Sequence, residues 1–231
     1  MSIWSKGNPC PKCPSSDAYK QGEFGWKCFS CGFFKGTDAW ALDQTDYAER
    51  ESNSFDGQLP ADYSSEMPQE YHDWIAQYLP VELFPEYSKT YGRLIFPIYY
   101  KGELKCWQGR ALNREPKWLT KSGRHPWGTK FPYISGNSNT YVITEDIISA
   151  IKVSQVHPAI SILGSSVNQE YVNFLLTLGS EFIIWLDNDE AGHKGAQQLF
   201  DKLKLCANIK LIHSEFDPKC YSVTRIREYL K

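Results

Sequence analysis

The pattern of apolar and polar residues changes several times along the chain, and each change predicts a different structure. Residues 1–36 contain glycine, proline and aromatic residues without helical periodicity, which predicts a small β unit. Residues 69–79 carry apolar side chains at helical spacing, which predicts a packed helix. Residues 93–112 are rich in aromatic and β-branched side chains, and they predict two strands joined by a turn at Lys101 and Gly102.

From about residue 136 onward, strand-like and helix-like segments alternate. This alternation is typical of a parallel, Rossmann-like α/β sheet, in which each crossover between strands contains a helix. The strands are expected at 140–144, 159–163, 181–186 and 208–213, and the helices at 145–155, 168–179 and 190–204.

Composition limits the class of protein. The chain has 231 residues, of which 42% are hydrophobic, enough to build the core of one large domain or of two to three small ones. No stretch approaches the ~18 unbroken apolar residues of a membrane helix, and the first residues lack the apolar run of a signal peptide. We therefore expect a cytoplasmic protein that does not associate with a membrane.

The formal net charge of -2 conceals a segregation of charge along the chain. Residues 37–72 contain nine acidic residues and one basic residue, and the low hydrophobicity of 37–67 predicts an acidic linker. Residues 93–130 contain nine basic residues and two acidic ones, so this region is expected to attract polyanions such as nucleic acids.

Four of the seven cysteines form two C-x-x-C pairs, which are separated by fourteen residues. Thiolates at this spacing predict a closed, tetrahedral and therefore structural zinc site formed by Cys10, Cys13, Cys28 and Cys31. The neighbouring Trp26 has two interpretations, because an aromatic ring beside basic residues can stack on single-stranded bases or can simply cover the zinc.

Carboxylates follow two of the predicted strands. Glu145 follows one strand, and Asp187 and Asp189 follow a later one, so all three are expected at the same edge of the sheet. Carboxylates that converge repel each other unless a cation lies between them, which predicts a site for magnesium or manganese. The alternative is that each acid caps a helix and faces water. Asp217, after the last strand, is a further candidate.

The stretches "VITED" and "WLDNDEAGHKGA" resemble the Toprim domain, whose pattern is a glutamate after one strand and Asp-x-Asp after a later one. The first stretch departs from the family pattern, because Asp146 stands where the family has glycine and Ser149 where it has aspartate. The resemblance implies that the catalytic and magnesium-binding residues are Glu145, Asp187 and Asp189, with Asp217 as an additional ligand or as the holder of a bound water.

The stretches "YGRLIFPIYY", "WQGRAL" and "PKWLTKSG", in this order, resemble the polymerase region of the DnaG-type primases. The resemblance implies a groove for the template and the incoming nucleotide. Its lining residues would be Arg93, Arg110 and Lys117, with Lys121 and Lys130 as further candidates.

The order of the predicted parts is also that of bacterial and bacteriophage DnaG-type primases. It comprises a β zinc ribbon (1–36), the acidic linker (37–67), a basic α+β subdomain (68–135) and an α/β Toprim domain (136–231). The last two would form the polymerase core. The implied activity is that of a nucleotidyltransferase, a DNA-dependent RNA polymerase that makes RNA primers for replication from ribonucleoside triphosphates on single-stranded DNA.

The sequence contains no G-x-x-x-x-G-K-[S/T] motif, so we expect the replicative helicase, like the DNA polymerase, to be a separate protein. This favours a bacteriophage or plasmid primase, which if phage-encoded acts in the cytoplasm of a bacterial host. Two alternatives remain at this point. One is a RecR-like recombination mediator, which also combines zinc with a Toprim fold, and the other is a Toprim nuclease.

Overall fold

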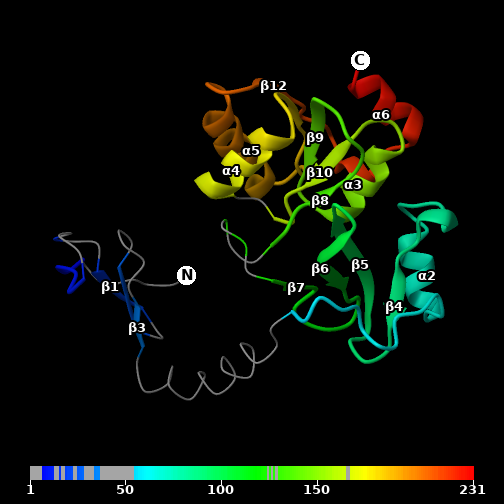
Figure 1. The fold of residues 1–231 in the computed structure, drawn as a ribbon, viewed down its shortest axis with the longest axis horizontal. Coiled ribbons are helices and arrows are strands. Elements are labelled where there is room, and N and C mark those ends of the chain that lie inside the picture. The colour runs from blue at the N-terminus through cyan, green and yellow to red at the C-terminus, as the bar shows by residue number, and fades with distance from the viewer. Residues whose placement is uncertain are drawn as a thin grey trace. The chain divides into compact units, whose positions relative to one another are not determined.

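The computed structural model describes residues 7–12, 16, 19–22, 25–28, 34–36, 55–123, 125, 127, 130–164 and 167–231 (Figure 1). The chain divides into two compact units, residues 1–54 and 55–231. None of the helices in the described ranges is long and apolar enough to cross a membrane.

The first unit contains a small antiparallel sheet in the order β1-β2-β3. Tyr19 on β1 and Trp26 on β2 stack with their ring centroids 5.2 Å apart. The strands are β1 (Tyr19–Gly22), β2 (Gly25–Cys28) and β3 (Phe34–Gly36). This sheet agrees with the β unit that the sequence predicts for this region.

The second unit begins with residues 55–67, which fall within the range that the charge pattern assigns to the linker. The carboxylate of Asp62 accepts hydrogen bonds from the Ser88 hydroxyl at 2.6 Å and from the Thr90 amide at 2.7 Å. The bond from Ser88 contributes most to lowering the pKa of Asp62, to about 2. These hydrogen bonds attach the acidic segment to the sheet that follows, and the charge of Asp62 strengthens them.

An antiparallel sheet with the order β4-β5-β6-β7 comes next. Its central hairpin turns at Lys101 and Gly102, which have φ values of 52° and 83°, as expected for a type I′ turn that matches the twist of the strands. The elements are α2 (Gln69–Ile75), η1 (Val81–Leu83), β4 (Glu86–Ser88), β5 (Arg93–Tyr100), β6 (Glu103–Arg110) and β7 (Trp118–Ser122). The predicted helix and hairpin are both present, although the helix is shorter than expected.

The C-terminal part is a mostly parallel sheet with the order β12-β11-β9-β10-β8, in which only β8 is antiparallel to its neighbour among the described strands. It confirms the predicted α/β architecture. The elements are β8 (Tyr133–Ile134), β9 (Thr140–Thr144), α3 (Ile147–Ser154), β10 (Ala159–Ser161), α4 (Gln169–Leu178), β11 (Glu181–Ile184), α5 (Glu190–Leu203), β12 (Asn208–Leu211), η2 (Pro218–Cys220) and α6 (Val223–Tyr229).

Strand β9 lies inside this sheet and is buried on both faces. Tyr141 and Ile143 pack into the core beneath α4 and α5, whereas Val142 packs on the opposite face with residues of α3 and α6 (Figure 1). Ile148 of α3 also joins the core of the antiparallel sheet. The two sheets therefore pack through α3, and the carboxyl ends of β9 and β11 are held close to strands β6 and β7.

Candidate active site

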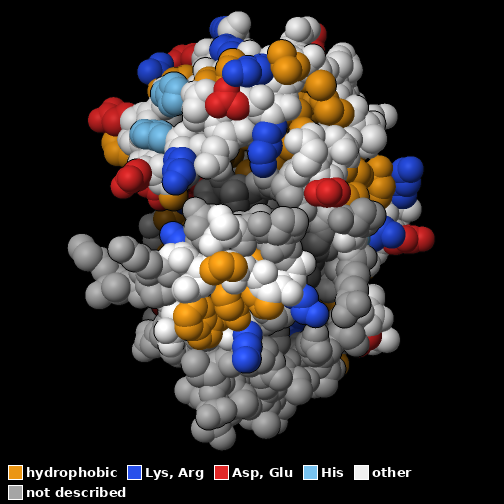
Figure 2. Space-filling view, turned by 90° about the vertical axis from the view of Figure 1, so that its left-hand side faces the viewer, with side chains coloured by type: hydrophobic (Ala, Val, Ile, Leu, Met, Phe, Trp, Pro, Cys, Tyr) orange, Lys and Arg blue, Asp and Glu red, His pale blue; other side chains and the backbone are white. Residues whose placement is uncertain are grey.

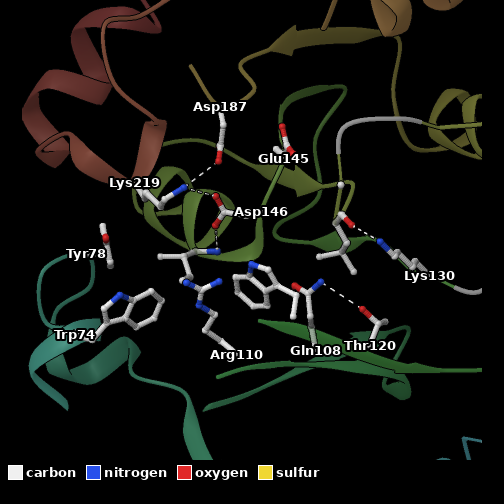
Figure 3. A pocket seen from close by; sticks show the side chains of 14 residues that line it. Trp74, Tyr78, Gln108, Arg110, Thr120, Lys130, Glu145, Asp146, Asp187 and Lys219 are labelled. Carbon is white, nitrogen blue, oxygen red and sulfur yellow. Dashed lines mark hydrogen bonds and ion pairs between the residues drawn. The ribbon is translucent and has the colours of Figure 1, made fainter. Parts of the chain in front are cut away.

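Acidic side chains gather at the carboxyl ends of β9 and β11, which are hydrogen-bonded neighbours with Ile143 paired to Ile184. Glu145 and Asp187 follow these two strands, and both line a cavity of about 680 Å³. Asp146 lines the same cavity (Figure 3). One wall of the cavity is therefore acidic because parallel strands end at a common edge.

The facing wall comes from β6, β7 and α2. Side chains alternate along a strand, so Gln108 and Arg110 of β6 both point toward the cavity. The guanidinium carbon of Arg110 lies 5.1 Å from the ring centroid of Trp74 and 5.2 Å from that of Trp118, which holds it by two cation–π contacts (Figure 3). Among the described residues, neither Arg110 Nε nor Gln108 Oε1 has a hydrogen-bond partner, although both atoms are buried. Both residues therefore bring unused hydrogen-bonding capacity to the cavity wall.

Lys219 of η2 inserts its ammonium group among the carboxylates. Its Nζ atom lies 2.8 Å from Asp146 Oδ2, 3.0 Å from Asp187 Oδ2 and 2.8 Å from Asp217 Oδ2. The Lys219 side chain is only 18% exposed. Burial alone would lower the pKa of Lys219, but the charges of Asp146 and Asp187 raise it well above its ordinary value, so the ammonium stays protonated.

The pKa values of two carboxyl groups in the acidic wall are raised. Burial raises the pKa of Glu145, and the neighbouring charges of Asp189 and Asp146 raise it further. Burial together with the charge of Asp146 raises the pKa of Asp187 to about 7, despite the opposing effect of Lys219. A cation bound here would relieve this repulsion.

The oxygen atoms present fit a hard divalent cation. Glu145 Oε2 and Asp187 Oδ1 are buried, and neither has a hydrogen-bond partner in the described part of the chain. In the same part of the chain, no three His, Cys, Asp or Glu side chains form a ready-made ligand cluster. Magnesium is often held by one or two carboxylates and completes its shell with water and substrate phosphates, so the chemistry of these two oxygens fits this ion.

The other two predicted carboxylates have different environments. Asp189 is the N-cap of α5, where its Oδ1 accepts a hydrogen bond from the Gly192 amide at 2.7 Å, and its charge contributes to the raised pKa of Glu145. Asp217 Oδ1 accepts a hydrogen bond from the Asn188 amide at 2.9 Å. Burial opposes the hydrogen bonds from Lys219 and Asn188, which together lower the pKa of Asp217.

Arg93, one of the predicted nucleotide-binding residues, does not face the cavity. Leu94 is the partner of Arg110 across the strands, so Arg93 lies on the opposite face of the sheet. It is 4% exposed, and its Nη1 donates to the carbonyl of Lys117 at 3.1 Å. In this arrangement Arg93 is a positioning residue for the turn that carries Lys117.

Of the remaining predicted basic residues, Lys130 lines the cavity, whereas Lys117 and Lys121 do not. Lys117 is exposed on the turn before β7. Lys121 lies on the face of β7 opposite to Trp118 and Thr120, which both line the cavity. Lys130 also lines the cavity, and its Nζ donates to the Leu163 carbonyl at 2.8 Å.

Charged groups elsewhere are mixed. On the upper part of the face seen in Figure 2, acidic and basic side chains are interspersed rather than gathered in separate patches.

The predicted zinc ligands lie in the first unit. Cys28 ends β2 and is fully buried, and Cys10 Sγ accepts a hydrogen bond from the Lys12 amide at 3.3 Å. Cys13 and Cys31 lie outside the described residues. The zinc site therefore stays a prediction from the cysteine spacing.

Several cavity residues were missed by sequence reasoning. The sequence presents Trp74 only as an apolar residue of a predicted helix, Trp118 only as part of the stretch "PKWLTKSG", and Gln108 as an ordinary polar residue. Lys219, in "DPKC", carried no signal at all, because only the fold returns η2 to the ends of β9 and β11.

Comparisons with known proteins agree with this geometry. The family model described as Toprim-like matches residues 143–221. The zinc-binding and RNA polymerase domains of the Aquifex aeolicus primase align at a TM-score of 0.57 and 14% identity, over 99% of this chain and 80% of theirs. The fold is that of the DnaG-type primases.

Two further primase structures align with this chain. The primase fragment of the bacteriophage T7 primase-helicase aligns at a TM-score of 0.51 and 14% identity, covering 99% of this chain and 98% of the fragment. A DnaG primase catalytic domain bound to single-stranded DNA aligns at a TM-score of 0.51 and 18% identity, covering 84% of this chain and 71% of that domain's chain. A search of the curated proteins finds no match.

Gly192 permits the acidic wall to form, because α5 begins directly against the backbone of Asp187. A Cβ atom at this glycine would lie 2.1 Å from the Asp187 carbonyl oxygen. We predict that Gly192→Ala lowers the free energy of unfolding by about 1–3 kcal/mol, as overpacking does, in a urea titration. Gly123→Ala is the control, because nothing lies within 4 Å of its Cβ position. Equal stability of the two variants would contradict the prediction.

Proposed function

We propose that this protein is a DNA primase, a nucleotidyltransferase that synthesises short RNA primers from ribonucleoside triphosphates on a single-stranded DNA template. The observation that carries the proposal is the pairing of an acidic wall with an arginine-bearing, aromatic wall across one cavity, within the fold shared with known primases. Joining two nucleotides requires a site of this kind, because phosphoryl transfer depends mainly on positioning and on neutralising charge.

The acidic wall would hold magnesium or manganese through Glu145, Asp187 and Asp189. When bound, the metal would neutralise the triphosphate and favour ionisation of the attacking 3′-hydroxyl. Opposite this wall, the guanidinium of Arg110 would bind phosphate oxygens of the incoming nucleotide, since it is fixed between Trp74 and Trp118 before the ligand arrives.

The groove for template and nucleotide would continue from Arg110 through the exposed Lys117 and through Lys130, with Lys121 on the outer face of the sheet. Contacts of these lysines with phosphates would be independent of base sequence and would weaken with salt. Arg93 would support the groove by holding the Lys117 turn.

The first unit would be a zinc ribbon, with one structural zinc ion held by Cys10, Cys13, Cys28 and Cys31. A unit of this size buries little core of its own, so zinc would supply much of its folding energy. Trp26 would then stack on a template base near the start site. We propose the domain boundaries 1–36, 37–67, 68–135 and 136–231 for the corresponding parts, with the last residues of the linker packed on the sheet through Asp62.

The proposed partners are single-stranded DNA, a separate replicative helicase and a DNA polymerase.

The Asp187→Asn variant tests the proposal directly. Purified protein is incubated with single-stranded DNA of varied sequence, labelled ribonucleotides and magnesium or manganese, and the products are resolved on a gel. We expect short RNAs from the unmodified protein and at least about a 100-fold lower yield from Asp187→Asn, because a ligand of the catalytic cation is lost. DNA affinity should stay within about twofold of that of the unmodified protein, since Arg110, Lys117 and Lys130, which would supply most of it, are intact.

Asp201→Asn is the matched control, because Asp201 is exposed on α5 and outside the cavity. An equal yield from Asp187→Asn and Asp201→Asn would refute the assignment of the acidic wall. Shortening of the DNA in place of RNA synthesis would support the nuclease, and DNA binding without either product would support the recombination mediator.

Arg110→Lys separates geometry from charge. The lysine keeps the positive charge but loses the planar fork and its place between the two indoles. We expect the KM for ribonucleoside triphosphates to rise about tenfold, the equivalent of one charge-assisted hydrogen bond. Arg227→Lys, an exposed change on α6, should leave the KM unaltered. An unchanged KM for Arg110→Lys would exclude contact between this side chain and the nucleotide.

Cys28→Ser tests the zinc ribbon. Loss of one thiolate should release the zinc, measured by atomic absorption, and should impair initiation more than extension of a supplied primer. Cys206→Ser is the control, because Cys206 is exposed and outside the C-x-x-C pairs. An equal loss of initiation and extension would instead indicate general misfolding.

A further inference from the structure

The hydrogen bonds of the acidic wall divide its oxygens into two groups. Lys219 Nζ contacts Asp146 Oδ2, Asp187 Oδ2 and Asp217 Oδ2, so its three N–H donors each have an acceptor. Asp146 Oδ1 also accepts from the amides of Ile148 and Ser149. The carboxylates on this side are therefore already paired within the protein.

The second group is unpaired. Glu145 Oε2 and Asp187 Oδ1 are buried without a hydrogen-bond partner in the described ranges. Asp187 thus belongs to both groups, because one of its oxygens faces the ammonium and the other has no protein partner. A divalent cation that contacted Glu145 Oε2 and Asp187 Oδ1 would satisfy both orphaned atoms, and it would not compete with Lys219, whose contact with Asp187 is to the other oxygen, Oδ2.

We propose that Lys219 is the resident cation of this cluster and occupies the position of a second divalent ion. The chain would then bind one divalent cation, on the side of Glu145 and Asp187, while Asp217 would contact the ammonium and would not be a metal ligand. The inference deepens the proposed function, on which it rests, because it assigns the metal stoichiometry of that same site. The fixed charge of Lys219 positions Asp187 for the single ion.

Metal stoichiometry tests this without reference to turnover. The zinc-loaded full chain is titrated with manganese, and bound ions are counted by electron paramagnetic resonance and by calorimetry. We expect one manganese site that is lost in Glu145→Gln. Lys219→Met removes the ammonium at similar length, and we expect it to gain a second site, whereas Lys219→Arg keeps the charge and should retain one.

Asp217→Asn provides a second test if Lys219→Met does not fold. If Lys219 rather than a metal binds Asp217, manganese affinity should change by less than about twofold, whereas removal of a ligand carboxylate weakens it by about tenfold or more. Four results would each overturn the proposal. They are two manganese sites in the cluster of the unmodified chain, no manganese site there, a single site in folded Lys219→Met, and a tenfold loss of manganese affinity in Asp217→Asn. Primer synthesis is measured separately, so that one manganese site without RNA products would refute the proposed function and leave the role of Lys219 standing.

Discussion

Carboxylates crowd the edge of the parallel sheet where β9 and β11 end, and their repulsion is the constraint on which the rest of the site depends. The protein offsets part of it with helix caps, since Asp146 and Asp189 accept amide hydrogen bonds at the starts of α3 and α5. It offsets another part with the ammonium of Lys219. What remains is a raised pKa at Glu145 and Asp187, which indicates where further positive charge is needed.

The cavity wall that faces the carboxylates comes from a different sheet and carries a positive charge. Arg110 reaches the cavity from β6, and Trp74 and Trp118 hold its guanidinium in place by contacts from a helix and a neighbouring strand. A side chain fixed in this way loses little conformational freedom when a phosphate binds. The packing of Ile148 into the core of the antiparallel sheet keeps the two walls facing each other.

Local pattern was sufficient for most of the architecture. The hairpin was predictable because runs of aromatic and β-branched residues flank Lys101 and Gly102. In the structure these two residues adopt the left-handed backbone conformation that a tight turn requires. The parallel sheet was predictable because apolar strands and amphipathic helices alternate. β8 and α6 were not predicted, since a strand of two residues and a helix of seven have too few positions to establish a period. The segment around Asp62 resembles its acidic neighbours in charge, and its hydrogen bonds with Ser88 and Thr90 depend on the tertiary structure.

The sequence by itself determined which carboxylates follow the strands, which segment carries most of the basic residues and which cysteines have the spacing of a zinc site, because these depend on local order along the chain. Tertiary structure decided which of those side chains meet. It placed Arg93 on the face of the sheet away from Arg110, and it brought Lys219 from η2 into the carboxylates that precede α3 and α5. Such contacts join residues that are far apart in sequence. Which side chains meet depends on how the two sheets pack, and no local sequence pattern encodes that packing.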